Sequence, residues 1–383
     1  MENVLLIDTN YSAAPIYDYL IKSGYKVYVC GSNPHDFLAK VASNYLNIDY
    51  SDTNRLLSEI NLNEIDYIIP GCNDQSYEAC ARINFNNNYY GIDALSTTTT
   101  INNKANFRAI ATQLGLSIPR VISASEASDI WPLVVKPVDA YSGRGITIVQ
   151  EKEKDKLTAA IILAKEFSKS DACIIEEFVD GQLYSHSAFL SGDKIVAEFV
   201  VEEHGSANPF VVDTSRVIDN FSPGILQRIR TEVILMADHL EMVNGLIHTQ
   251  FIVKDLHFWI IEITRRCPGD LYSLLIEKST GYNYAKAFTK PFLNKKLTAN
   301  NETCKSSHIL RHTISQSHEM QFKSIKFNTF LNVDQYVPLC LTGDIVKESP
   351  FGRIGLIFLK TASEHELSVL MNKTLMRKIY TIC

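Results

Sequence analysis

Short apolar runs alternate with helical patterns along the first hundred residues. The expected strands and helices, in chain order, cover residues 4–8, 13–22, 26–30, 34–42, 45–48, 52–60, 66–70 and 74–83. Strands that alternate with helices in this way form a parallel sheet with helices on both faces. The sequence therefore predicts an N-terminal doubly wound parallel α/β domain.

Ligands of such sheets bind beyond the carboxyl ends of the strands, which here means residues 8–12 and 71–75. The first of these turns, DTNYSAA, lacks the glycines of a dinucleotide fingerprint. Its composition therefore disfavours a nicotinamide or flavin dehydrogenase. Asn73 and Asp74 are candidates for substrate contact, although capping of the next helix explains them more simply.

Residues 101–114 show a helical pattern that Gly115 ends, and the first domain boundary is placed just before this helix. Lys104 falls in the first turn, where the positive end of the helix dipole disfavours a cation. A solvated lysine is the simpler explanation. An anion bound nearby would make this lysine a candidate ligand for it.

The segment WPLVVKPV, residues 131–138, is an apolar strand that contains one charge, Lys136. Buried lysines are uncommon unless an anion pairs with them. A glycine-rich turn, DAYSGRGI, follows and joins this strand to a second one at residues 147–150. The exposed amides, the hydroxyl and the guanidinium of such a turn suit phosphate oxygens, although an ordinary turn is an equally good explanation. Its candidate ligands are Ser142, Gly143, Arg144 and Gly145.

The segment CIIEEFVDG, residues 173–181, is an apolar strand that runs into two adjacent carboxylates. One of the two acids must face each side of the strand. A strand that ends at solvent would explain this pattern. The alternative is a hinge whose backbone reads an adenine edge while Glu176 accepts a hydrogen bond from the adenine amino group.

The segment GLIHTQFIVKDLHFWIIEITRRCPGD, residues 245–270, predicts an antiparallel hairpin. A three-residue turn centred on Asp255 would place His248 opposite Glu262, with Gln250 diagonal to Glu262 on the same face. A shift of one residue would separate these side chains. Polar oxygens on one face of an apolar hairpin suit Mg²⁺, and a polar solvent face is the alternative. Arg265 and Arg266 follow at once, available to developing negative charge.

The order of these features resembles the ATP-grasp superfamily. That order is a helix-start lysine, a strand lysine, a glycine-rich hairpin, an EE hinge, and a carboxylate hairpin that ends in arginine. The resemblance implies three parts: a pre-ATP-grasp α/β domain at residues 1–100, an ATP-grasp α+β clamp at 101–295, and a small β-rich C-terminal subdomain at 296–383.

By this likeness, Lys104 and Lys136 would contact ATP phosphates while the loop at residues 141–145 closes over them. Glu176 and the backbone of Glu177, Phe178 and Val179 would hold adenine. Arg266, with Lys136 and Arg144, would stabilise the transferred phosphoryl group. The implied ligands of Mg²⁺ (or Mn²⁺) are Gln250, Glu262 and Thr264.

This sequence departs from the usual family pattern at three positions. Gln250 stands where a second metal-binding glutamate is common, although carbamoyl phosphate synthetases also use glutamine there. Thr264 replaces an asparagine, and Leu183 replaces an acid that often binds ribose. Because carboxylates are better Mg²⁺ ligands than amides or hydroxyls, metal binding is expected to be weaker than usual.

The activity that the resemblance implies is ATP-dependent ligation of a carboxylate, activated as an acyl phosphate, to an amine or thiol. Two alternatives remain open. One is a carboxylase that works through carboxyphosphate, and the other is an ATP-binding regulatory protein without turnover, which the three departures favour. In the C-terminal part, His308, Arg311, His312 and His318 are candidate substrate contacts, although surface placement explains each of them more simply.

Composition and charge narrow the partners. The formal net charge of −6 disfavours a dedicated nucleic-acid binder but allows one small polyanion in a local basic pocket. The eight cysteines are scattered without a CxxC pair, which favours reduced thiols over a zinc or disulfide framework. The chain shows neither a basic signal-peptide start nor a membrane-length apolar run, so we expect a cytoplasmic protein without a membrane partner. Small carboxylate and amine substrates are expected, and the family likeness is compatible with a homodimer.

Overall fold

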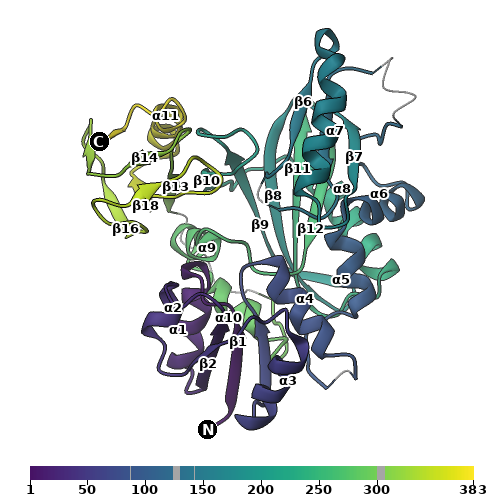
Figure 1. Cartoon of the computed structure of the whole chain (residues 1–383), viewed down its shortest axis with the longest axis vertical. Helices are drawn as coiled ribbons and strands as arrows, with labels where there is room; N and C mark the ends of the chain where they lie inside the picture. The colour runs from purple at the N-terminus through teal and green to yellow at the C-terminus, as the bar shows by residue number, and fades with distance from the viewer. Residues whose placement is uncertain (87, 124–129, 142, 300–306) are drawn as a thin grey trace.

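The computed structural model describes residues 1–86, 88–123, 130–141, 143–299 and 307–383. Its N-terminal part, at the bottom of Figure 1, is a four-stranded parallel sheet in the order β3-β2-β1-β4. The strands are β1 (Asn3–Ile7), β2 (Lys26–Gly31), β3 (Tyr45–Asn47) and β4 (Tyr67–Pro70). The strands β1, β2 and β4 are buried along most of their length, in agreement with their largely apolar sequences NVLLI, KVYVCG and YIIP. The predicted doubly wound parallel domain is confirmed.

Helices separate these strands, as the sequence pattern predicts. They are α1 (Ala14–Lys22), α2 (Phe37–Val41), α3 (Thr53–Leu62) and α4 (Asp74–Ile83). Asp52 caps α3 by accepting from the backbone N–H of Arg55, and Asn73 caps α4 by accepting from that of Ser76. The capping interpretation of Asn73 is therefore confirmed. The second helix begins three residues later than predicted, after an extended Asp36.

The helix predicted at residues 101–114 is confirmed over residues 104–113, but its start is wrong, because the segment contains parts of two helices. They are α5 (Leu95–Asn102) and α6 (Lys104–Gln113). Between them Asn103 is extended, and its side chain accepts from the backbone N–H groups of Ala105 and Asn106. An asparagine N-cap starts a new helix at Lys104, so this lysine occupies the first helical position.

A small antiparallel sheet in the order β6-β5-β7 follows, covered by α7 at the upper right of Figure 1. Its elements are β5 (Leu133–Pro137), β6 (Thr147–Val149), β7 (Cys173–Glu177) and α7 (Asp155–Phe167), with a 3-10 turn at Glu151–Glu153. Leu133, Val135 and Ile175 from the sheet pack on Ala160 and Ala164 of α7. The hairpin predicted around the glycine-rich loop is confirmed by the β5–β6 pairing.

The largest element is an eight-stranded sheet in the order β12-β11-β8-β9-β10-β13-β18-β16. Its strands are β8 (Gln182–Ser191), β9 (Lys194–His204), β10 (Thr214–Val217), β11 (Gly245–Lys254), β12 (His257–Thr264), β13 (His308–Ile314), β16 (Val333–Pro338) and β18 (Gly355–Thr361). All of its pairings are antiparallel. The sheet continues across the boundary predicted near residue 295, because β13, β16 and β18 extend the sheet that β8–β12 begin.

Helices connect this sheet to its neighbours. The helix α8 (Pro223–His239) packs against β11 and β12, whereas α9 (Tyr272–Thr280) and α10 (Tyr284–Thr289) share a core with the N-terminal sheet. The remaining elements are a 3-10 turn (Tyr11–Ala13), α11 (Glu364–Leu375) and the paired short strands β14 (Met320–Gln321) with β17 (Ile345–Val346) and β15 (Ile325–Phe327) with β19 (Tyr380–Ile382). In the described parts of the chain, no helix combines the length and apolar character needed to cross a membrane.

Candidate active site

Lys136, at the buried end of β5, pairs with a carboxylate on the neighbouring strand. Its Nζ lies 2.6 Å from Oε2 of Glu176, and Arg108 Nε lies 2.5 Å from Oε1 of the same residue. Arg108 also donates to the carbonyl of Ile261 at 2.9 Å, so it joins α6, β7 and β12. Burial acts to raise the pKa of Glu176, but the Lys136 and Arg108 cations lower it to about 2. Glu176 is therefore ionised and fixed.

This pairing gives Glu176 a different partner from the predicted adenine amino group. The residue is fully buried and both of its oxygens bond to cations of the protein itself. An acid that compensates two buried cations cannot turn outward without leaving them unpaired. Glu176 therefore differs from the other hinge residues in its contacts. It pairs with Lys136 and with Arg108, which the sequence analysis missed.

Two of the three remaining hinge residues have N–H groups that already bond within the protein. The N–H of Glu177 donates to the carbonyl of Arg120 and the N–H of Phe178 donates to that of Pro132, both at 3.0 Å. Within the described residues, the N–H of Val179 has no hydrogen-bond partner. Its partly buried position leaves it able to bind a ligand.

Lys104 reaches from the start of α6 toward the loop that follows β5. Its Nζ donates to the carbonyl of Ala140 at 2.7 Å and lies 5.9 Å from the ring centroid of Tyr141. Burial lowers the pKa of Lys104. The negative charge of Glu262 opposes this shift, and the positive charge of the nearby Lys136 adds to it. The two lysines and Glu262, which are far apart in the sequence, therefore share one electrostatic environment.

The glycine-rich loop is held by close backbone contacts. Gly143 has a φ of +72°, and a Cβ atom there would lie 2.7 Å from the carbonyl oxygen of Phe210. Gly145 has a φ of +70° and lies similarly close to Phe167. Only glycine combines this backbone conformation with such contacts. The exposed Arg144 lies over the ring of Phe351, 5.4 Å from its centroid, and Ser142 lies outside the described residues.

The predicted register of the β11–β12 hairpin is wrong. The turn contains two residues rather than three, with Asp255 at a φ of +54°, and the register shifts again between Gln250 and Phe251. Gln250 therefore lies directly opposite Glu262, and His248 lies opposite Thr264. The shift leaves Ile261 as an extra residue on β12. The predicted common face of these polar residues is nevertheless retained, because the turn and the bulge together move the register by two residues.

These residues offer oxygen atoms of the kind that Mg²⁺ or Mn²⁺ binds. Within the described residues, the carboxylate of Glu262 has no hydrogen-bond or ion-pair partner, and the buried hydroxyl of Thr264 has no partner either. Gln250 donates through Nε2 to Glu203, which leaves its Oε1 available. No group of three or more His, Cys, Asp or Glu side chains suited to a metal occurs in the described part of the chain. The oxygen atoms of Glu262, Gln250 and Thr264 instead fit a hard cation that also takes phosphate oxygens.

The two arginines after β12 have different surroundings. Arg266 makes a two-pronged ion pair with Asp74, at 3.0 and 3.2 Å, and therefore joins β12 to the N-terminal domain. Although burial acts to lower it, Asp74 and Glu262 raise the pKa of Arg266. Arg265 is fully buried against Asp93, with its Nε at 2.7 Å from the carboxylate. Arg266 borders the polar site, whereas Arg265 holds the hairpin in place.

The C-terminal candidates divide into buried and accessible residues. Surface placement is wrong for Arg311 and His312, which are buried, whereas His318 is exposed and His308 is partly buried. Arg311 donates to Ser215 and to the carbonyl of Asp270, and its buried Nε has no hydrogen-bond partner among the residues that the structure describes. Arg311 and His312 are buried because β13 is an interior strand of the large sheet.

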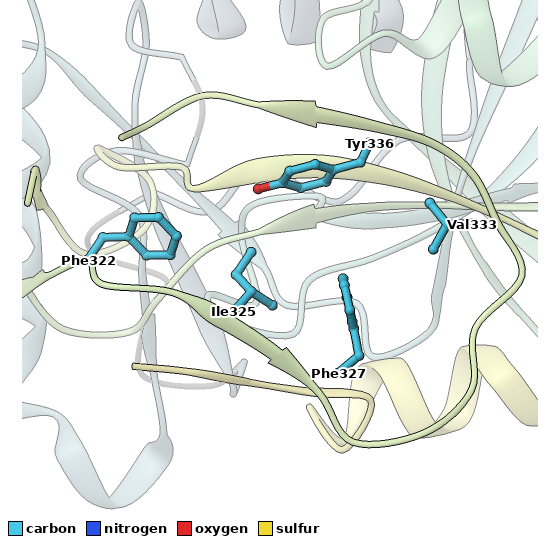
Figure 2. Close-up of a pocket in the computed structure, with 5 residues that line it drawn as sticks. All are labelled: Phe322, Ile325, Phe327, Val333 and Tyr336. Carbon is cyan, nitrogen blue, oxygen red and sulfur yellow. The ribbon is translucent and has the colours of Figure 1, made fainter. Parts of the chain in front are cut away.

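An apolar pocket of about 300 Å³ lies apart from the polar site, in the C-terminal part of the chain. Figure 2 shows side chains of β15 and β16 projecting toward one another around it. Its lining residues are Phe322, Ile325, Phe327, Val333 and Tyr336. None of the predicted site residues lines it.

Sequence and structure comparisons agree with this arrangement. Residues 130–273 match the family model of the ATP-grasp domain. The formate-dependent phosphoribosylglycinamide formyltransferase of Synechococcus sp. (strain CC9311) is 28% identical over 141 residues, which are 35% of this chain and 36% of that protein. The carbamoyl phosphate synthase large chain of Vibrio parahaemolyticus is 25% identical over 239 residues, which are 60% of this chain and 21% of that protein. The chain thus covers well under half of these curated relatives.

Solved structures match over the whole chain. An L-amino acid ligase from Bacillus licheniformis has a TM-score of 0.81 at 18% identity, with 100% of this chain and 98% of that chain covered. Phosphoribosylglycinamide synthetase from Anaerococcus prevotii has a TM-score of 0.76 at 17% identity, with coverage of 100% and 99%. At these identities the likeness establishes the fold. Together with the family match, it shows that this chain carries an ATP-grasp domain over residues 130–273 within an ATP-grasp-type fold.

Proposed function

We propose that this protein is an ATP-dependent ligase that joins a carboxylate to an amine and releases ADP and phosphate. The observation that carries the proposal is that cations from separate elements converge beside the carboxylate of Glu262. Lys136 and Arg108 share the carboxylate of Glu176, Arg108 also donates to the carbonyl of Ile261 next to Glu262, and Lys104 reaches the loop that follows β5. Cations beside an unpaired carboxylate suit a polyphosphate and its divalent ion.

In the first half-reaction, a carboxylate oxygen of the substrate attacks the γ-phosphorus of ATP and the bond to the bridging oxygen of ADP breaks. Lys104 and Lys136 hold phosphate oxygens, and Arg266 stabilises the negative charge of the transferred phosphoryl group. The loop that contains Gly143, Arg144 and Gly145 covers the phosphates. The backbone of Glu177 to Val179 binds the adenine edge.

In the second half-reaction, the amine attacks the acyl carbon and phosphate leaves, while the amine loses a proton. Glu262, the Oε1 atom of Gln250 and the hydroxyl of Thr264 would hold Mg²⁺ or Mn²⁺, which neutralises phosphate charge when bound. The protein's contribution is to align the reacting groups and to exclude water. Glu176 contributes indirectly, because it fixes the ammonium of Lys136.

A phosphate-release screen with ATP, Mg²⁺ and pooled amino acids and small carboxylates tests this function. We expect release that requires both a carboxylate and an amine, and that falls at least about 100-fold in Lys136→Ala and Glu262→Ala. Lys326→Ala, at an exposed position, is the matched control. Release that requires bicarbonate alone would instead favour a carboxylase, and ATP binding without any release would favour a regulatory protein. Undiminished turnover in both site variants would overturn the assignment of the site.

A further inference from the structure

A buried carboxylate on β9 contacts the glutamine of the proposed metal site. Oε2 of Glu203 accepts from Nε2 of Gln250 at 2.7 Å, and Oε1 accepts from the hydroxyl of Ser185 at 2.8 Å. Glu203 is only 4% exposed, and Ser185 is completely buried. The contact spans three adjacent strands, because Ser185 pairs with Gln250 across β8 and β11 while Glu203 belongs to the next strand.

This contact determines which way the Gln250 amide points. The carboxylate of Glu203 accepts from Ser185 through Oε1 and from the amide through Oε2, so the NH₂ group of Gln250 faces Glu203. The opposite orientation would bring two oxygen atoms together in a buried place. The oxygen Oε1 is consequently the polar atom of Gln250 that remains for a cation, on the residue directly opposite Glu262.

We propose that Glu203 is a positioning residue that orients Gln250, and that the pair Glu203–Gln250 does the work of a single metal-binding carboxylate. The amide supplies the ligand oxygen, and the buried acid behind it holds that oxygen toward the site. This inference rests on the proposed function, because it assigns a role to residues around the divalent ion of that site. It also gives a reason for a neutral residue at position 250.

The inference makes an unusual prediction for Gln250→Glu. Carboxylates bind Mg²⁺ better than amides, so in isolation this change should improve the site. In this protein it would place a second carboxylate within hydrogen-bond distance of Glu203 and opposite Glu262, where like charges repel. The exchange variant Glu203→Gln/Gln250→Glu restores one donor and one acceptor with the total charge unchanged.

The test is a double-mutant cycle read out by Mn²⁺ binding in the presence of saturating ADP, with free Mn²⁺ measured by electron paramagnetic resonance. We expect Glu203→Gln and Gln250→Glu each to weaken Mn²⁺ binding about tenfold or more, and the exchange variant to recover most of the loss. Glu202→Gln is the matched control, since the carboxylate of Glu202 pairs instead with His204 and Arg216. It should leave Mn²⁺ binding unchanged.

Urea unfolding of each variant separates a loss of fold from a loss of metal binding. Tighter Mn²⁺ binding by Gln250→Glu, or losses that simply add in the exchange variant, would overturn the inference even if the wild-type protein releases phosphate in the substrate screen. Conversely, the expected cycle in a protein that shows no phosphate release would support the positioning role and reject the proposed ligase activity.

Discussion

The ammonium of Lys136 lies 2.6 Å from the carboxylate of Glu176, and both groups are buried in the small sheet next to α7. The pair crosses from β5 to β7, where Lys136 opposes Ile174 and Glu176 opposes Val134. Burying a pair of this kind costs desolvation energy, and removal of one partner strongly destabilises the protein. Its geometry explains why a lysine can occupy an otherwise apolar strand.

Glu176→Gln should destabilise the fold and weaken ATP binding. The change leaves Lys136 and Arg108 without a compensating charge, which costs about 3–5 kcal/mol for a broken buried pair. Urea unfolding measures the free energy, and the KM for ATP reports the position of Lys136. Glu177→Gln is the adjacent control, because Glu177 is only partly buried and accepts from the backbone N–H of Arg120. Equal stability losses in the two variants would contradict the assigned role of Glu176.

His312 should make stability fall as the pH decreases below 6.5. Burial lowers the pKa of His312 to about 4, against an ordinary value of 6.5. The unfolded chain therefore takes up a proton first, so stability is fully present above pH 6.5 and is lost progressively as the pH falls toward 4. By linkage the loss amounts to roughly 3 kcal/mol.

Urea unfolding at pH 7, 6 and 5 tests this dependence. His312→Gln should reduce the slope in this range, with part of the slope remaining because burial also lowers the pKa of His248, to about 3, whereas His318→Gln, at an exposed position, should leave the wild-type slope. The buried imidazole bonds to Thr214 and Tyr380, so the variant will also lower stability at pH 7. An unchanged slope in His312→Gln would show that another group carries the pH dependence.

Adjacent arginines should respond differently to replacement by alanine. Arg265→Ala leaves the fully buried Asp93 without its cation and should cost about 3–5 kcal/mol of stability. Arg266 keeps 18% of its side chain exposed, so Arg266→Ala should cost less stability. Its main effect should be a fall in kcat of about 100-fold or more, from the loss of charge stabilisation. Stability curves and turnover of both variants, measured side by side, check the contrast. If Arg265→Ala lost more turnover than Arg266→Ala relative to its loss of stability, the two assigned roles would be reversed.

Local sequence signals predicted most of the N-terminal domain, and they supplied most of the residues that we propose for the site. Apolar runs and helix caps at Asp52 and Asn73 lie close together in the chain, so their structure follows from local propensity. The same signals failed at the start of the helix predicted at residues 101–114, where the extended Asn103 divides α5 from α6. They also failed for the β11–β12 register, which depends on a two-residue turn and on the extra residue Ile261.

The sequence by itself determined the alternating N-terminal fold and which polar residues interrupt apolar strands, because both depend on side-chain periodicity along a short segment. Only the tertiary structure decided the partners of those residues. Glu176 bonds to Lys136 and Arg108, Arg266 bonds to Asp74, and Gln250 bonds to Glu203, across separations of 40 residues or more in the sequence. Such pairs arise because burial requires each charge to find a compensating group in space, and the order of strands in the folded sheets determines which group is near.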